Sequence, residues 1–160
     1  MKRIPLTPLS QGRFALVDDA DYDYLMQWKW HAAKNYKRFY ALRSTWKNKK
    51  RITIMMHREI MQPPKNLQID HIDHDGLNCQ RSNMRICTLQ QNCRNRDVSI
   101  NSRSKYKGVA ITGKYISATI WIDKKTTYLG RFKTEEAAAR AYDAKAKELF
   151  GEFANLNFKD

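Results

Sequence analysis

The chain has 160 residues, enough for one domain or two small ones, and an apolar content of 42% favours packed cores over disorder. Its 30 Lys and Arg residues outnumber its 16 Asp and Glu residues, and the net charge of +14 predicts a polyanionic partner, either nucleic acid or an anionic membrane surface. No window approaches the roughly 20 apolar residues that span a bilayer, and no apolar segment follows the basic start, so we expect no membrane partner, no secretory signal and a cytoplasmic location.

The three cysteines argue against structural disulfides and against a structural zinc site. Cys79, Cys87 and Cys93 are odd in number and form no C-x-x-C pair. Neither a disulfide framework nor a four-ligand zinc site is therefore expected, and free thiols in a reducing compartment fit better.

The first 60 residues are typical of a mixed, mostly β segment. Residues 21–26 favour one or two helical turns that begin at acidic side chains. Trp28 and Trp30 alternate with Lys29 and His31, which predicts a half-buried strand. Further strands are predicted at residues 13–17, 39–42 and 52–56.

A basic hairpin tip is predicted at residues 47–51, between two of these strands. It either contacts phosphates or is an ordinary solvated turn, and the charge of the whole chain favours contact with DNA. Residues 57–61 then predict a short helix that ends before Pro63 and Pro64.

Residues 70–76 concentrate three carboxylates and two of the four histidines before a turn-forming glycine. An apolar-rich strand at residues 83–88 and a short helix at 89–96 with a basic outer side follow. This order allows four polar side chains to converge: Asp70, His71, Asn83 and Asn92.

These residue types suit phosphodiester hydrolysis. His71 is mostly neutral near pH 7 and can accept a proton from water, because an unperturbed imidazole has a pKa of about 6.5. The side-chain carbonyl of Asn83 can fix its tautomer. Oxygens of Asp70 and Asn92 can hold a hard cation beside the phosphate.

The stretch IDHIDHDGLNCQRSNMRICTLQQN resembles the HNH endonuclease family, in particular its phage-type homing nucleases. The resemblance implies a ββα-metal unit and one divalent ion, Mg²⁺ or Mn²⁺, per active site, held by Asp70 and Asn92. His71 would be the general base and Asn83 would orient it. It also implies a phage-encoded protein in a bacterial host.

Three nearby residues have open roles. His57 either approaches the metal site or serves packing or a hydrogen bond, and the structural role is favoured. Asp73 and His74 either contact the ion or phosphate or are solvated.

Residues 97–105 have the composition of a linker, because they are rich in Ser and Asn and lack apolar periodicity. Basic side chains in and before it are expected to lie along DNA: Arg94, Arg96 and Arg103.

The C-terminal part predicts a three-stranded sheet with one helix. Residues 115–122 alternate strictly between apolar and outward side chains, which is a strong strand pattern. Thr134 is the expected N-cap of a helix over residues 135–149 that covers the apolar face, and Gly151 the expected stop. The other two strands are predicted at residues 107–111 and 126–132.

This part is similar to the plant ethylene-response-factor type of DNA-binding domain over residues 104–158, through the segments YKGV, EEAAARAYD and FANLNF. The resemblance implies that the sheet lies in the major groove of DNA. The residues expected to face DNA are Lys107, Thr119, Trp121, Thr126 and Tyr128, flanked by Lys124 and Lys125.

The sequence thus predicts an α+β protein with an N-terminal mixed β region that contains a ββα-metal HNH unit, followed by a three-stranded antiparallel sheet packed on one helix. We expect a nuclease domain at 1–97, a linker at 98–105 and a DNA-binding domain at 106–160. The predicted function is that of a monomeric, metal-dependent, site-specific endonuclease for double-stranded DNA that nicks one strand in a homing-type role. The alternatives are a non-catalytic sequence-specific DNA-binding regulator and an RNA-binding or ribosome-associated protein.

Overall fold

The computed structural model describes residues 1–7, 12–99 and 101–158. These residues form small antiparallel sheets and four α-helices, so the predicted α+β class is confirmed. By its internal contacts the chain divides into two compact units, 1–89 and 90–160, and each is described by itself. Among the described residues, no helix has both the length and the apolar composition needed to cross a membrane.

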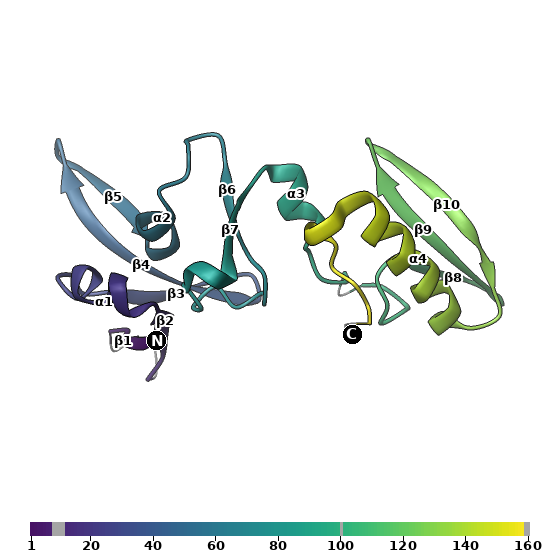
Figure 1. Cartoon of the computed structure of the whole chain (residues 1–160), viewed down its shortest axis with the longest axis horizontal. Helices are drawn as coiled ribbons and strands as arrows, with labels where there is room; N and C mark the ends of the chain where they lie inside the picture. Colours follow the sequence, from purple (N-terminus) through teal and green to yellow (C-terminus); the bar gives the residue numbers. More distant parts are fainter. Residues whose placement is uncertain (8–11, 100, 159–160) are drawn as a thin grey trace. The chain divides into compact units, whose positions relative to one another are not determined.

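The first unit is built from three antiparallel sheets and two helices (Figure 1). β1 pairs with β2, the strands β3, β4 and β5 form a meander in that order, and β6 pairs with β7. Its elements are β1 (Lys2–Pro5), β2 (Phe14–Val17), α1 (Asp19–Leu25), β3 (His31–Asn35), β4 (Arg38–Lys47), β5 (Lys50–Met55), α2 (Met56–Met61), β6 (Gln68–His71), a 3-10 helix (Arg81–Asn83) and β7 (Met84–Cys87).

The strand predicted through Trp28 and Trp30 is wrong. β3 begins only at His31; Trp28 lies in a bend after α1, and Trp30 forms an isolated parallel β-bridge with Leu6 directly before the strand. Trp30 is fully buried, and its Nε1 donates a hydrogen bond of 2.8 Å to the carbonyl of Leu25, the last residue of α1. The buried indole therefore provides a hydrogen-bond donor for a backbone carbonyl at the end of α1.

The short helix α2 ends as predicted before the two prolines. Its C-cap Gln62 adopts a left-handed backbone with φ 43°, and Pro63 follows, so the helix cannot continue. Met56, His57 and Ile60 are buried on the inner side of α2.

The hairpin of β6 and β7 carries three of the four residues predicted to converge, Asp70, His71 and Asn83, and has a long connection, residues 72–83. Gly76 in this connection packs against β4, where an added Cβ would lie 2.5 Å from the carbonyl oxygen of Phe39 and 2.6 Å from the Tyr40 ring. Glycine is therefore required there for close packing rather than for the turn alone.

The second unit contains α3 from Gln90 onward, the predicted three-stranded sheet and its helix. The sheet has the order β10, β9, β8, and α4 lies along one face of it (Figure 1). Thr134 is the N-cap, as predicted, and its Oγ1 accepts a hydrogen bond from the Ala137 amide; the C-cap is Gly151, with φ 54°. The elements are α3 (Leu89–Arg94), β8 (Val109–Thr112), β9 (Tyr115–Ile122), β10 (Lys125–Phe132), α4 (Glu135–Phe150) and a 3-10 helix (Gly151–Phe153).

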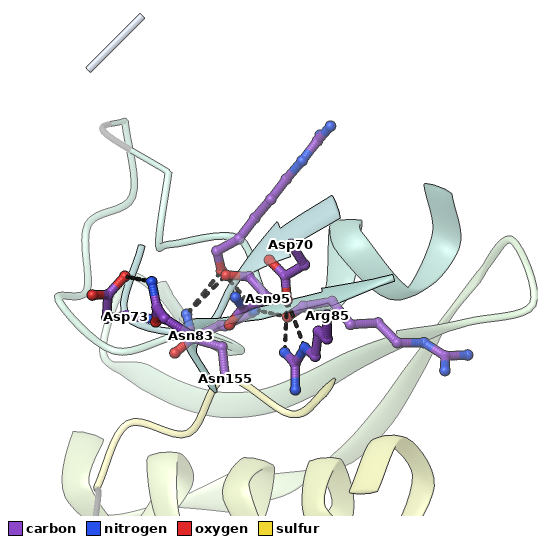
Figure 2. A network of polar contacts seen from close by, with 9 residues as sticks. Asp70, Asp73, Asn83, Arg85, Asn95 and Asn155 are labelled. Atoms are coloured by element: carbon purple, nitrogen blue, oxygen red, sulfur yellow. Dashed lines mark hydrogen bonds and ion pairs between the residues drawn. The ribbon is translucent and has the colours of Figure 1, made fainter. Parts of the chain in front are cut away.

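The C-terminal segment is fastened to this unit by an asparagine. The Asn157 side chain accepts a hydrogen bond from the Lys107 amide at 2.6 Å and donates to its carbonyl at 3.0 Å and to Asp143 at 2.9 Å. At the other end of the segment, Asn155 donates to the backbone carbonyls of Asn95 and Arg96 (Figure 2).

Ser104, near the end of the segment predicted as a linker, is held against α4 within the second unit. It is buried, and its hydroxyl donates a 2.6 Å hydrogen bond to Glu135 at the start of α4. The packed fold therefore begins before residue 106, while the domain boundaries themselves remain a prediction.

Candidate functional site

Asp70 and Arg85 form a buried ion pair across the β6–β7 hairpin. The two residues lie opposite each other in the strand register. Nε and Nη2 of Arg85 both donate to Oδ2 of Asp70, at 2.9 and 2.7 Å (Figure 2). With Asp70 only 3% exposed, this pairing compensates for the burial of the carboxylate.

His71 ends β6 and lies in a cluster of three rings. Its imidazole is 5% exposed and meets His57 of α2 edge-on at 5.2 Å between ring centroids. The Tyr40 ring of β4 lies 5.8 Å from His57 and 5.9 Å from His71. Three elements distant in sequence therefore fix the orientation of His71.

Burial keeps both imidazoles neutral. It lowers the pKa of His71, although the carboxylates of Asp73, Asp70 and Asp75 act in the opposite direction. It also lowers the pKa of His57 to about 3, with the neighbouring His71 and Arg58 as smaller causes. His71 at pH 7 is therefore in the form that accepts a proton.

Asn83 holds the loop that follows His71. Its Oδ1 accepts a hydrogen bond from the Asp73 amide at 3.0 Å, and its Nδ2 donates to Asp73 Oδ1 at 2.8 Å (Figure 2). The same Nδ2 donates to the Asn78 carbonyl at 2.9 Å. Both amide protons are thus used within the loop. Asn83 therefore holds the backbone that follows the histidine, and the orientation of His71 by the Asn83 carbonyl stays a prediction.

Asp73 is the centre of that loop. Burial acts to raise its pKa, but hydrogen bonds from the Asp75 amide, Asn78 and Asn83 outweigh it, and the pKa is lowered. The carboxylate therefore serves loop structure. His74 is half-buried with a left-handed backbone, φ 69°.

Asn92 lies on α3, in the second unit, so its sharing of an ion with Asp70 stays a prediction. Within the part of the chain that the structure describes, no three His, Cys, Asp or Glu side chains gather as metal ligands. An ion here would depend on one carboxylate, an amide oxygen and oxygens of water or phosphate.

The outward face of the second unit's sheet brings four predicted residues together. Thr119 lies opposite Tyr128, and Trp121 lies opposite Thr126, on neighbouring strands. Trp121 and Tyr128 are 58% and 60% exposed. The flanking Lys124 and Lys125 are exposed at the turn of the same hairpin.

Lys107 differs from expectation. Its ammonium is half-buried and donates hydrogen bonds to the backbone carbonyls of Arg94 and Arg96, and burial lowers its pKa to about 8. It therefore serves as a cap for the end of α3, and its predicted contact with DNA has no support from this arrangement. The Arg94 guanidinium lies over the Phe150 ring at 4.4 Å, while Arg96 and Arg103 are exposed.

Sequence reasoning missed Arg85 and Tyr40. Opposite charges that face each other across paired strands indicate an ion pair. The pairing of Asp70 with Arg85 depends on the strand register, which cannot be deduced from the sequence because the connection between β6 and β7 is long. Tyr40 was assigned to a strand without its role beside His71.

Two comparisons with known proteins identify the family of this chain. The HNH endonuclease family matches residues 62–94, which include Asp70, His71, Asn83 and Asn92. An uncharacterised HNH endonuclease from Acanthamoeba polyphaga mimivirus is 33% identical over 148 residues, which cover 92% of this chain and 76% of the relative. The chain belongs to the HNH endonuclease family.

Other relatives of this HNH endonuclease match only about a third of it. An ethylene-responsive transcription factor from Arabidopsis thaliana is 46% identical over 61 residues, 36% of this chain and 25% of the relative. A second, AP2-like ethylene-responsive factor from the same plant is 47% identical over 58 residues, 34% of this chain and 12% of the relative. The chain thus spans a quarter or less of these plant proteins.

Proposed function

We propose that this HNH endonuclease is a metal-dependent, site-specific nuclease for double-stranded DNA that nicks one strand as a monomer in a homing-type role. The observation that carries the proposal is the end of β6, where a buried carboxylate and a neutral imidazole are adjacent: Asp70 and His71. Family membership supports the reaction class, and the buried, neutral imidazole supports His71 as the base.

His71 would take the proton from the attacking water. Its neutral imidazole is held between His57 and Tyr40, so little reorganisation precedes proton transfer. Asn83 and Asp73 keep the following loop in place and so define the edge of the site. His71 does not need to lose a proton before the reaction can start at pH 7.

The donor set fits one Mg²⁺ or Mn²⁺. Carboxylate and amide oxygens are hard ligands, and two protein ligands leave positions for water and phosphate oxygens. Asp70 and Asn92 would hold the ion, with Arg85 fixing the orientation of the Asp70 carboxylate. When bound, such an ion stabilises the charge that develops on the phosphate and the leaving oxygen.

The second unit would determine which DNA sequence the nuclease binds. Support comes from the exposed aromatic face formed by Trp121 and Tyr128 and from the similarity to plant transcription factors. Bases and sugars would meet this face, while Lys124, Lys125 and the exposed Arg96 and Arg103 would contact phosphates. Two DNA-binding parts on one chain raise the effective concentration of the nuclease at its site.

A metal titration tests the proposal. Supercoiled plasmid is incubated with the full chain and Mn²⁺ or Mg²⁺, against a chelator control, and with the variants Asp70→Asn and Asn92→Ala. We expect nicking only with metal, and a rise of about tenfold or more in the metal concentration for half-maximal nicking in both variants. Retardation of DNA without any metal-dependent nicking would favour the non-catalytic regulator instead.

A further inference from the structure

We propose that the outer end of the β4–β5 hairpin, residues 44–53, is a second DNA-binding element that holds the duplex to one side of the active site. The choice of duplex DNA as its ligand rests on the proposed nuclease function. We call residues 44–53 the hairpin end. In Figure 1 its turn is the end of β4 and β5 that projects from the first unit.

The charge of this region is one-sided. Residues 24–58 contain ten Lys and Arg residues and no Asp or Glu. Four of the basic residues lie at the hairpin end, all exposed, and none of these side chains forms an ion pair with a described residue. They are Lys47, Lys49, Lys50 and Arg51. Such a surface attracts the phosphates of a nucleic acid.

Some of these basic residues lie at positions where they destabilise the hairpin. Lys47 lies directly opposite Lys50, and like charges in that position repel. Lys49 has a left-handed backbone, φ 61°, in a two-residue turn where glycine is preferred. A sequence selected only for a stable hairpin would avoid both choices, so the positive charge is there for a ligand.

Trp46 adds an aromatic surface to this charge. It is 72% exposed, lies opposite Arg51, and makes no ring or cation–π contact within the described ranges. Tryptophan and arginine side by side, with their apolar and planar surfaces uncovered, are typical of interface anchors. Bases and sugars offer the flat apolar partner, and phosphates offer the anion.

The strand connects the hairpin end to the active site. The register of β4 with β5 is regular from Leu42 to Lys47, so side chains alternate without a bulge, and Trp46 shares a face of the strand with Tyr40. The Tyr40 ring lies 5.9 Å from His71. Six residues at about 3.3 Å each place Trp46 roughly 20 Å along the strand, the length of about six base pairs.

A binding experiment without metal tests this. The full chain is titrated by fluorescence anisotropy, in chelator, against a labelled duplex of about three helical turns. Trp46→Ala should weaken binding about tenfold, and Trp46→Phe should retain most of the affinity. Lys49→Glu with Arg51→Glu should weaken binding and lower the salt slope by about two. The control Lys133→Glu with Lys147→Glu changes net charge equally on another part of the chain and should have little effect.

Unchanged affinity in the hairpin variants, or an equal loss in the charge control, would overturn the proposal. So would a loss of affinity for single-stranded RNA with unchanged binding of duplex DNA. Unaltered urea unfolding of each variant excludes misfolding. The binding experiment needs no cleavage, so it separates the two proposals. If the wild-type chain does not cleave DNA but its duplex binding depends on the hairpin end, the proposed nuclease function is refuted and the hairpin-end proposal is supported.

A truncation series checks the distance. With the nick mapped on an end-labelled duplex, the flank on each side is shortened in steps. Shortening one flank to fewer than about six base pairs from the nick should slow the wild type, and the rate of Trp46→Ala should not depend on the length of that flank. Equal sensitivity of the two proteins to every truncation would contradict the placement.

Discussion

His57 makes the stability of the first unit depend on pH. Its pKa is about 3 in the folded chain, against 6.5 for an ordinary histidine, because the ring is buried against His71 and Tyr40. Between these values the unfolded chain binds a proton that the folded chain does not, so stability falls as the pH falls. Below pH 6.5 each pH unit costs about 1.4 kcal/mol, which gives about 2 kcal/mol between pH 7 and pH 5.

The perturbation is His57→Phe, which keeps a ring in the pocket and removes the proton site. Urea unfolding at pH 7 and pH 5 is followed by tryptophan fluorescence, to which the fully buried Trp30 contributes. The wild type should lose about 2 kcal/mol or more between pH 7 and pH 5, since the lowered pKa of His71 acts in the same direction. The loss in His57→Phe should be smaller than the wild-type loss by about 2 kcal/mol, because the variant lacks this proton site. His31→Phe is the matched control.

The reasoning fails if the wild-type free energy of unfolding is the same at both pH values. It also fails if His57→Phe loses as much stability as the wild type. Either result would mean that the imidazole takes up a proton inside the folded chain without cost.

Three further predictions concern single side chains. Asn83→Ala removes three loop hydrogen bonds and should lower the free energy of unfolding by about 2–3 kcal/mol in urea titrations; a loss below about 0.5 kcal/mol would contradict its role. Gly108→Ala should cost at least about 3 kcal/mol in the same assay, because its Cβ would lie 1.9 Å from the Tyr142 ring, whereas Gly113→Ala, with open space, should cost about 1 kcal/mol; equal costs would refute this. Lys107→Met should abolish a rise in stability between about pH 8 and 10.5, since the buried ammonium loses its proton earlier in the folded chain than in the unfolded one; a rise that persists would show that Lys107 does not cause it.

The sequence predicted elements well where one face of a strand or helix is buried. Residues 115–122 form β9 because the alternation there reflects a buried and an exposed face of the strand. Thr134 caps α4 because its hydroxyl accepts a hydrogen bond from a free amide in the first turn of the helix. The same rule failed at Trp28 and Trp30, since alternation over four residues also arises from a bend followed by an isolated β-bridge with one buried indole.

The site was predictable in residue type but not in contacts. Asp70 and His71 stand next to each other in the chain, so their proximity needs no tertiary information. The Arg85 partner depends on strand register, and the ring packing of His57 and Tyr40 depends on how α2 and β4 meet. The expectation that Lys107 faces DNA comes from the family resemblance, whereas its hydrogen bonds to the end of α3 are long-range contacts that the sequence does not reveal.

Nicking of supercoiled plasmid by His71→Ala tests the central claim most directly. His31→Ala serves as the matched histidine control, and duplex retardation in chelator shows that each variant still binds. The account predicts metal-dependent nicking by the wild type and His31→Ala, and a loss of at least about a hundredfold in rate for His71→Ala with unchanged retardation. Wild-type rates in His71→Ala would show that this imidazole is not the base.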